Sequence, residues 1–508
     1  MKKTLSIVVL TVFMVFAFAF GASADTFTDV SGHWAESAIN EWSKYGIIEG
    51  FEGRFRPDAN ITRGEMATII QRLMSYQKTT ANTFSDLNAE DWYTDPMLRL
   101  NAAGIMIGDG AGHANPKATI TRQEAITMIT RVMGMEGYSY SGDLPYTDTQ
   151  TMSTWARPYI SIMYDQGALS WAGSTIAAKQ PITRAEVISM LDSLIVEVWS
   201  SSGLYCQHVK GNALIRSSKV YLHNCSIEGN VLVSGKATGV VLEHCDVKKV
   251  VSGADNVTVI DDNTGQVSAF YYGSYDVPVA AGAPHNRYQA ANFSRDNKNR
   301  AFYAEPGIIS RSGIDVSQWQ NDIDWQKVAA DGIDFAFIRL GYRGYEVGSL
   351  NLDTKYYQNM DGAIANGIDV GVYIFSQAIN VEEAVAEANM CINYLKDYDI
   401  TYPVVFDWET VGSETARTNN IDGTVLTDCA MAFCETIENA GYDAMIYSYK
   451  NLALRTLDMS RIEKYPFWFA GYTTWPEFYY DFDFWQYSSS GNVDGIQGNT
   501  DMDIEFVR

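Results

Sequence analysis

One short stretch of the chain, Tyr402 to Glu409 (YPVVFDWE), places two carboxylates directly after an apolar run. The run Val404–Phe406 is typical of a strand that is buried on both faces in a parallel sheet. Asp407 and Glu409 are one residue apart, so their side chains share one face of an extended chain, about 6–7 Å apart at Cα. A buried charge needs a partner or a shifted pKa. The pair therefore predicts either caps for a following helix or a functional site.

The first residues predict export from the cell. A basic start at Met1-Lys2-Lys3, an apolar run from Leu5 to Phe20 and small residues up to Ala24 are typical of a secretory signal peptide, residues 1–24. An uncleaved anchor is the alternative, but the apolar run is short for a membrane span. No later stretch of the sequence is long and apolar enough for a span. We therefore expect a secreted protein with no transmembrane anchor after signal cleavage.

The charge balance argues against nucleic acid as a partner. The formal net charge is −24, whereas nucleic-acid binding requires a basic face. From Gly307 to Arg508 there are 12 Lys and Arg residues against 31 Asp and Glu residues, so most of the excess lies in the last domain.

Cysteine and histidine usage excludes several chemistries. Six Cys residues in a secreted chain of 508 do not form a disulfide framework, although the pairing of Cys391, Cys429 and Cys434 stays open. The spacings contain no metal-binding motif, so no metal and no organic cofactor is expected. All six His residues lie at or before His285, so His-based hydrolysis is not available to the C-terminal region.

A triple repeat organises the N-terminal third of the chain. The motif Ile-Thr-Arg-x-Glu begins at Ile61, Ile120 and Ile182, at intervals of 59 and 62 residues. In each copy the Thr and the Glu three residues later predict a capping box that opens an amphipathic helix. The Arg lies in the first helical turn, where the helix dipole disfavours a cation. Three Arg residues at this position suggest recognition of an anion.

Each copy is preceded by an Asp, a Trp and then a Gly that follows a helical stretch. In chain order these are Asp29, Trp34 and Gly46; Asp86, Trp92 and Gly104; and Asp148, Trp155 and Gly167. This order resembles three S-layer homology modules, at residues 25–76, 81–135 and 144–198. The third departs from the pattern, with Tyr146 in place of Phe and Gly167-Ala-Leu in place of Gly-Ile.

The resemblance implies α-helical wall anchors that bind an anionic secondary cell-wall polysaccharide in grooves between repeats. The polymer contacts that it implies come from Arg63, Arg122, Arg184, Trp34, Trp92 and Trp155.

The middle of the chain is predicted to form β structure. Within residues 201–265, His223–Ile227 and Glu243–Val247 repeat at a period of 20, and Tyr205–His208 is a weaker copy. Such a period predicts the stacked coils of a small parallel β-solenoid. Three Cys residues would form an internal ladder as small apolar fillers: Cys206, Cys225 and Cys245. Residues 266–306 are polar and lack periodicity, which predicts a linker that is partly ordered by its aromatic residues.

Strands and helical patterns alternate from Gly307 to Arg508, which predicts an α/β barrel of about eight strands with an antiparallel final part. The expected strands are Gly313–Val316, Phe335–Leu340, Val370–Phe375, Val404–Trp408, Ala444–Tyr447, Phe467–Ala470, Phe484–Tyr487 and Met502–Phe506. In such barrels the chemistry lies at the carboxyl ends of the strands. Asp315 ends the first strand and Asp501 begins the last segment. A pocket with several acids, aromatic rings and no His or Cys pair is typical of glycoside hydrolysis.

The same region resembles the lysozymes of glycoside hydrolase family 25. The resemblance rests on Gly313–Gln320, Phe335–Arg339, Gly371–Ala378, Phe406–Glu409 and Trp485–Tyr487. It implies a flattened, TIM-like barrel over residues 307–508 that cleaves the β-1,4 bond between N-acetylmuramic acid and N-acetylglucosamine in peptidoglycan.

The resemblance also implies roles for individual residues, according to the family positions that they match. Glu409 matches the general acid, Asp407 its partner carboxylate, and Asp315 and Asp501 the other two acids. Substrate contacts are expected from Tyr373, Gln377, Tyr447 and Trp485. Asp503 departs from the family, which often has Asn there.

The resulting hypothesis is a multidomain muramidase that its repeats, rather than a membrane span, attach to the wall of a bacterium. The bacterium is expected to be Gram-positive. One alternative is a catalytically silent wall-binding protein; the four carboxylates weigh against it. Another is hydrolysis of a different wall bond, such as an amide, but the barrel lacks a metal or nucleophile set for it. The sequence leaves open a covalent or an acetamido-assisted mechanism, because the distance between the carboxyl groups decides between them.

Overall fold

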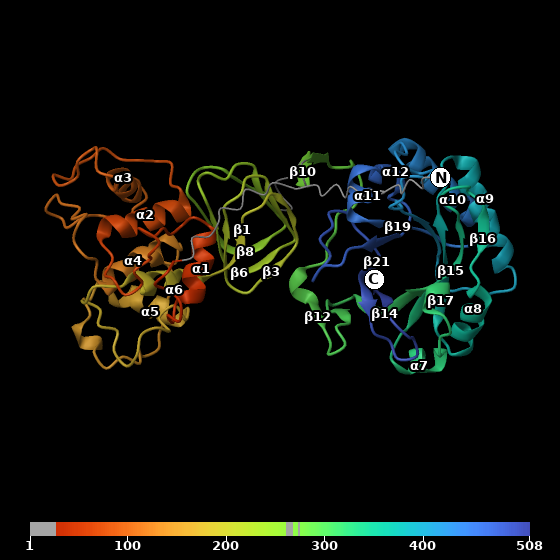
Figure 1. Cartoon of the computed structure of the whole chain (residues 1–508), viewed down its shortest axis with the longest axis horizontal. Coiled ribbons are helices and arrows are strands. Elements are labelled where there is room, and N and C mark those ends of the chain that lie inside the picture. The colour runs from red at the N-terminus through yellow and green to blue at the C-terminus, as the bar shows by residue number, and fades with distance from the viewer. Residues whose placement is uncertain (1–26, 261–267, 273–274) are drawn as a thin grey trace, which may run out of the picture. The chain divides into compact units, whose positions relative to one another are not determined.

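The structure is a computed structural model, and it describes residues 27–260, 268–272 and 275–508. The predicted signal peptide lies outside the described residues. The chain divides after Leu194 into two compact units. Figure 1 shows that the first is built of helices and loops and that the second contains the labelled strands.

Six helices form the part of the first unit that the structure describes, two for each sequence repeat. They are α1 (Glu36–Lys44), α2 (Arg63–Met74), α3 (Thr94–Ala102), α4 (Arg122–Val132), α5 (Arg157–Asp165) and α6 (Arg184–Leu194), with a 3₁₀ turn at Thr149–Thr151. The predicted capping boxes are present at Thr62 and Thr121, where the Glu three residues later bonds back to the cap. At the third site the Thr183 amide donates to Glu186 at 3.0 Å. The repeated motif therefore opens the second helix of each repeat, as predicted.

The repeated Asp fixes a turn in each copy. Asp29 accepts the amides of Phe55 and Arg56, both at 2.8 Å. Asp86 accepts Ala114 and Asn115 in the same way, and Asp148 does so in the third repeat. A short carboxylate that takes two backbone amides satisfies groups that the loop leaves unpaired. The three copies therefore share one local fold.

Two parallel sheets form the first part of the second unit. The strands are β1 (Ile195–Trp199), β2 (Gly203–Tyr205), β3 (His208–Val209), β4 (Asn212–Ile215), β5 (Val220–His223), β6 (Ser226–Val233), β7 (Val240–Glu243), β8 (Asp246–Ser252) and β9 (Val257–Ile260). One sheet has the order β1-β4-β6-β3 with β8 also on β6, and the other has the order β2-β5-β7-β9. Every pairing between these strands is parallel.

The register of these sheets repeats the period of the sequence. Tyr221 pairs with Val241, and Ser226 pairs with Asp246, each partner 20 residues further on. Cys225 and Cys245 pack in one apolar core between the sheets. Cys206 belongs to the neighbouring core. Each of the six Cys residues is free, so they act as apolar fillers.

The segment after these sheets is packed against the barrel. It contains β10 (Ala269–Tyr272), β11 (Tyr275–Pro278), a 3₁₀ turn at Ala290–Asn292, β12 (Phe293–Arg295) and β13 (Ala301–Tyr303). Tyr288 stacks on Phe506 with ring centroids 4.1 Å apart and donates its hydroxyl to the Phe482 carbonyl at 2.9 Å. Tyr288 and Tyr303 are buried. The residues expected to form a linker thus contribute core side chains.

The rest of the second unit is a closed barrel of eight strands. These are β14 (Ile309–Val316), β15 (Phe335–Arg343), β17 (Asp369–Ser376), β18 (Val404–Trp408), β19 (Ala444–Tyr449), β20 (Phe467–Ala470), β21 (Phe484–Gly491) and β22 (Thr500–Val507), with the short β16 (Leu350–Leu352) paired to β15. All eight predicted strands are confirmed. The antiparallel part is confined to β22, which runs opposite to both β14 and β21, whereas β21 is parallel to β20.

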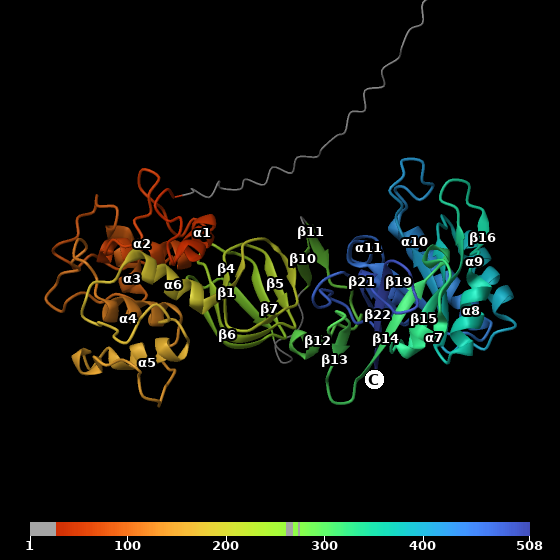
Figure 2. The same cartoon turned by 60° about the horizontal axis from the view of Figure 1, so that its bottom comes forward.

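Helices cover the barrel, and side chains fill it. The helices are α7 (Trp325–Ala330), α8 (Tyr356–Ala365), α9 (Val381–Leu395), α10 (Gly423–Asn439), α11 (Lys450–Arg455) and α12 (Met459–Ile462), with a 3₁₀ turn at Gln318–Gln320. Figures 1 and 2 both show α8, α9 and α10 along one flank of the strands. Inward residues such as Phe337, Val405 and Trp468 form the inner core. Their neighbours on the strands pack under the helices, as alternation along a strand requires.

The packed segment before the barrel yields a first prediction. A fragment of residues 307–508 lacks Tyr288 and Tyr303, and each buried aromatic side chain contributes about 2 kcal/mol. We expect this fragment to unfold at a lower temperature than a fragment of residues 275–508, measured by circular dichroism. In the longer fragment Tyr288→Ala should reproduce part of the loss, whereas Phe302→Ala, on an exposed side chain, should not. Equal midpoints for the two fragments would contradict the packing role.

Candidate active site and wall-binding grooves

A cavity of about 320 Å³ lies at the carboxyl ends of the barrel strands. Asp407 is the penultimate residue of β18 and has the same parity as Val405, which packs in the inner core, so its side chain points into the barrel. Glu409 follows the strand and lines the same cavity. In register, Asp407 lies between Phe375 of β17 and Tyr447 of β19.

The other two acids are brought together by the antiparallel strand. Asp315 at the end of β14 is paired in register with Asp501 at the start of β22. The amide of Gln486 on β21 donates to Asp315 Oδ2 at 2.6 Å. Its carbonyl oxygen accepts the hydroxyls of Tyr447 and Tyr472, both at 3.0 Å. One neutral side chain therefore connects an acid to two phenols and fixes all three.

Burial and mutual repulsion raise the pKa values of these acids above their usual range. Burial raises the pKa of Asp315, and the charges of Asp501 and Asp503 raise it further. Burial and then the adjacent Glu409 raise the pKa of Asp407, whereas Arg339 lowers it. Burial raises the pKa of Glu409 and brings that of Asp501 to about 6. A carboxyl group that holds its proton near neutral pH can act as a general acid.

Arg339 is the one Lys or Arg among the described residues that line the cavity, and it is paired with a carboxylate outside the acid cluster. Arg339 on β15 donates Nε to Asp353 Oδ2 at 2.7 Å, and its Nη2 lies 2.7 Å from the same oxygen. Asp353 is fully buried. Arg339 therefore offsets the negative charge of the cavity only in part, which agrees with the raised pKa values of the acids.

Aromatic rings line the cavity at two depths. Tyr373 and Tyr447 are buried in its wall, as the sequence suggested. Trp319 is 72% exposed and Tyr472 is 56% exposed, and both belong to the lining. Exposed rings beside a polar cavity suit stacking on sugar faces. Trp319, Tyr472 and Gln486 were not predicted from the sequence as site residues.

Two predicted substrate contacts do not line the cavity. Gln377 lies beyond the end of β17; its amide donates to the Glu409 carbonyl at 2.7 Å and accepts from the Thr418 hydroxyl at 2.8 Å. It therefore holds the backbone of Glu409. Trp485 is fully buried on the outer face of β21 and donates to the Gly471 carbonyl at 2.8 Å. Strand alternation gives the inward position to the next residue, Gln486.

In the first unit the three repeat motifs close a ring of backbone bonds. The Ile61 amide donates to Ile182, the Ile182 amide to Ile120, and the Ile120 amide to Ile61, at 3.0–3.1 Å. All three Ile side chains are fully buried. The repeats are therefore arranged cyclically, and the last contacts the first.

Each repeat Arg meets the capping Glu of the next repeat. Arg122 Nη2 lies 2.6 Å from Glu186 Oε1, Arg63 Nη1 lies 3.3 Å from Glu124 Oε1, and Arg184 Nη1 lies 3.8 Å from Glu65 Oε1. These three Arg side chains are only 12–19% exposed. The Arg residues that the sequence assigned to anion recognition thus already have a carboxylate partner within the protein.

Grooves between the repeats join these Arg residues to exposed Trp residues. One groove is lined by Arg184, by the α2 region including Arg72, and by Trp92. A second is lined by Arg63, by the α4 region including Arg131, and by Trp155. Trp34, Trp92 and Trp155 are 50–61% exposed. Each of the two grooves thus combines an Arg from one repeat, the second helix of the next and a Trp from the third.

Comparison with known proteins identifies both parts. The fold and site of the second unit define a barrel hydrolase with an acid cluster, and those of the first define a ring of three repeats. The model of the glycosyl hydrolases family 25 matches residues 314–496, and that of the S-layer homology domain matches residues 26–67, 83–126 and 145–188. The chain therefore carries three S-layer homology domains and a C-terminal domain of glycosyl hydrolases family 25.

Individual relatives match only part of the chain. An amylopullulanase from Thermoanaerobacterium thermosulfurigenes is 30% identical over 176 residues, which cover 34% of this chain and 9% of that protein. An autolytic lysozyme from Clostridium acetobutylicum is 27% identical over 193 residues, 38% of this chain and 54% of that protein. Among solved structures, the modular autolysin LytC from Streptococcus pneumoniae is 25% identical, with a TM-score of 0.36, over 48% of this chain and 62% of its own. The chain thus spans between about a tenth and a half of the length of these two curated relatives.

A deeply buried acid below the cavity gives the second prediction. Asp503 is fully buried; Oδ1 accepts from Trp468 Nε1 at 3.0 Å, and Oδ2 has no partner. Burial and Asp501 raise its pKa well above the usual range. The folded state therefore holds a proton that the unfolded chain releases near its ordinary pKa, so stability falls as pH rises above that value.

Asp503→Asn keeps the acceptor for Trp468 and removes the ionisable group. We expect a higher thermal midpoint than wild type at pH 8 and a difference that shrinks toward pH 4, measured by differential scanning calorimetry. Asp399→Asn, at an exposed position, is the matched control and should change neither midpoint. A lower midpoint for Asp503→Asn at pH 8 would show that the carboxylate is stabilising.

Proposed function

We propose that the protein is a wall-anchored peptidoglycan hydrolase that cleaves the β-1,4 bond between N-acetylmuramic acid and N-acetylglucosamine. The observation that carries the proposal is the convergence of Asp315, Asp407, Glu409 and Asp501 on one cavity with raised pKa values. The match of this domain to glycosyl hydrolases family 25 supports the same reaction.

Glu409 is the proposed general acid. Its carboxyl is partly exposed in the cavity, its pKa is raised by burial, and Gln377 holds its backbone. It would donate its proton to the leaving glycosidic oxygen. Asp407, more deeply buried on the same face, would stabilise the oxocarbenium-like state or orient the acetamido group of the substrate. Asp315 and Asp501 maintain the proton affinity of the site, and Trp319 and Tyr472 offer rings to the sugars.

The proposed anchor is the ring of S-layer homology domains. Its two described grooves present Arg and Trp side chains to an anionic cell-wall polysaccharide, which would place the enzyme on the surface of a Gram-positive bacterium. The carboxylates that pair with the repeat Arg residues orient their guanidinium groups. Arg72 and Arg131 add further guanidinium groups to the grooves, and each of them is also paired with a carboxylate, Glu49 and Glu136 respectively. None of the helices among the described residues is long and apolar enough to cross a membrane.

The middle domain is proposed to be a short β-solenoid. The parallel pairing and the 20-residue stagger of its strands support this.

The acid assignment is tested by Glu409→Gln. This change keeps the shape of the side chain and removes the proton donor, so cleavage of purified peptidoglycan should fall by at least about a hundredfold. Glu414→Gln, an exposed position on the following loop, is the control and should cleave normally. Mass spectrometry of the reduced products distinguishes reducing-end muramic acid from the products of an amidase. Near-normal cleavage by Glu409→Gln would remove Glu409 from this role, and no cleavage by wild type would favour a silent glycan-binding protein.

The anchor is tested with residues 27–194 alone, which form a compact unit. We expect binding to isolated walls that weakens as salt rises, because exposed charge pairs are screened over about 8 Å at physiological ionic strength. Arg63→Lys, in the groove that Trp155 also lines, keeps the charge but loses the planar fork. It should bind about tenfold more weakly, the scale of one charge-assisted hydrogen bond.

Arg157→Lys, an exposed residue outside the two grooves, is the matched control and should bind normally. Walls stripped of the polysaccharide should lose binding, and walls stripped only of peptide stems should keep it. Retention on walls that lack the polysaccharide would mean that the repeats bind peptidoglycan itself.

A further inference from the structure

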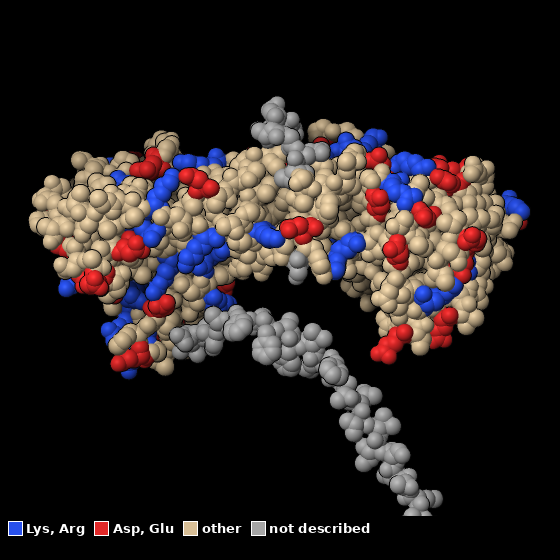
Figure 3. Space-filling view, turned by 90° about the horizontal axis from the view of Figure 1, so that it is seen from above, with Lys and Arg blue, Asp and Glu red and all other residues tan. Residues whose placement is uncertain are grey.

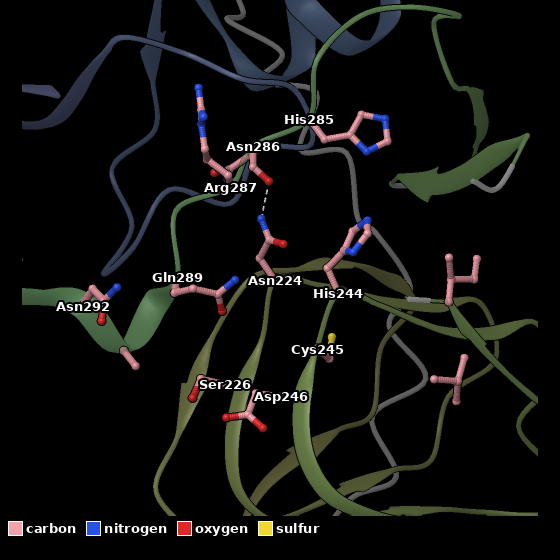
Figure 4. Close-up of a pocket in the computed structure, with 13 residues that line it drawn as sticks. Asn224, Ser226, His244, Cys245, Asp246, His285, Asn286, Arg287, Gln289 and Asn292 are labelled. Atoms are coloured by element: carbon pink, nitrogen blue, oxygen red, sulfur yellow. Dashed lines mark hydrogen bonds between the residues drawn. The ribbon is translucent and has the colours of Figure 1, made fainter. Parts of the chain in front are cut away.

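Three potential metal ligands meet at the junction between the parallel sheets and the segment that packs on the barrel. One ligand atom each from Glu243, His244 and His285 lies within 4.8 Å of the other two. They adjoin a pocket of about 850 Å³, far larger than the acid cavity. Figure 4 shows His244 and His285 one above the other on the same side of this pocket, His244 from the sheets and His285 from the segment that follows.

Glu243 presents one oxygen that no protein group satisfies. Its side chain is fully buried, and Oε2 accepts the Tyr221 hydroxyl and His223 Nδ1, both at 2.8 Å. Oε1 has no hydrogen-bond partner. An unpaired carboxylate oxygen is expensive to bury. The bonds to Oε2 fix the carboxylate in the way that outer partners orient metal-binding carboxylates.

His285 carries a second unsatisfied polar atom. Its Nε2 is buried and has no hydrogen-bond partner. Its ring packs on Tyr479 with centroids 4.6 Å apart, which sets its direction. Glu243 Oε1 and His285 Nε2 are thus both buried without a hydrogen-bond partner, on two residues that each have a ligand atom within 4.8 Å of a ligand atom of the other. This is the second observation, besides the clustering, that points to a ligand.

The coil repeat places His244 at a turn that aims its side chain into the pocket. His244 has a φ of 51°, and Asn224, its equivalent in the preceding coil, has a φ of 50°. Both residues line the pocket. Asn and His tolerate this left-handed conformation better than most residues. The same turn in two successive coils therefore carries Asn in one and an imidazole in the other.

We propose that Glu243, His244 and His285 bind one divalent transition-metal ion of the zinc type. Two imidazole nitrogens and one carboxylate oxygen are a donor set that Zn²⁺ accepts, with a fourth position left for water. The pocket provides room on that side. A hard ion such as Mg²⁺ prefers oxygen ligands and would be disfavoured.

The ion would tie the parallel sheets to the barrel. Glu243 ends β7 and His244 follows it directly, whereas His285 forms a β-bridge with Tyr480. The next residue, Asn286, donates to the Phe478 carbonyl of the barrel domain at 2.9 Å. The ion would thus join two structural parts that are distant in the sequence, and it would act apart from glycan cleavage.

The test is zinc binding by the intact, chelator-treated protein, followed by isothermal titration calorimetry and thermal unfolding. Wild type should bind one Zn²⁺ per chain, and zinc should raise its unfolding midpoint because the ion binds the native state. Removing a residue that hydrogen-bonds to a metal ligand typically lowers metal affinity 10- to 100-fold. Removing a ligand itself should therefore lower the affinity for Zn²⁺ by more than about a hundredfold.

Two variants remove ligands with little change of shape. His285→Phe keeps the ring that packs on Tyr479, and His244→Asn installs the residue that the preceding coil already has at this turn. His113→Asn is the control, because it removes an exposed His that contacts a carboxylate in the first unit. The control should bind like wild type, and both ligand variants should lose the bound ion and the zinc-dependent rise of the midpoint.

Equal zinc binding by wild type and both ligand variants, or no saturable binding by wild type, would overturn the proposal and leave a bridging water between Glu243 and His285. All variants should cleave peptidoglycan like wild type, because neither His residue lines the acid cavity. A failure of the muramidase proposal would appear in Glu409→Gln instead, so the two proposals fail separately.

Discussion

The reversed direction of β22 is the constraint on which the active-site cavity depends. A parallel strand would deliver its carboxyl end to this edge of the barrel, but β22 runs antiparallel to β14 and β21 and delivers its first residues there. Asp501 therefore faces Asp315, and Asp503 lies one inward step below. Burial is the largest cause of the raised pKa values of Asp315 and Asp503, and this placement adds the next largest, the charge of Asp501.

Local sequence patterns predicted the strands of the barrel correctly. The eight strands and the acids at their ends could be read from the sequence, because apolar runs and alternation are local properties. Gln377 and Trp485 could not be placed, since a side chain beyond the end of a strand follows the turn, and a shift of one residue reverses the face. Trp319 and Tyr472 enter the cavity from loops. Glu243 and His285 meet only through tertiary packing, so no spacing in the sequence reveals them.

Charge is handled differently in the two units. In the barrel, acids are crowded together and burial raises their pKa values, and the guanidinium of Arg339, which lines the cavity, is paired with Asp353. In the S-layer homology ring, each of the three motif Arg residues is paired with a carboxylate from the next repeat. The face drawn in Figure 3 carries separate acidic and basic side chains over the barrel end rather than one continuous patch of either sign. The chemistry of the protein therefore depends on enclosed charges more than on its overall acidity.

The cyclic bonds among Ile61, Ile120 and Ile182 also limit how such a protein can change over evolutionary time. An open array of repeats can gain or lose a copy at either end, because each copy contacts only its neighbours. Here the first and last copies are neighbours too, and Arg184 meets Glu65 across that junction. Duplication or deletion of a single copy would leave the circle unable to close. The count of three is thus a property of the whole ring.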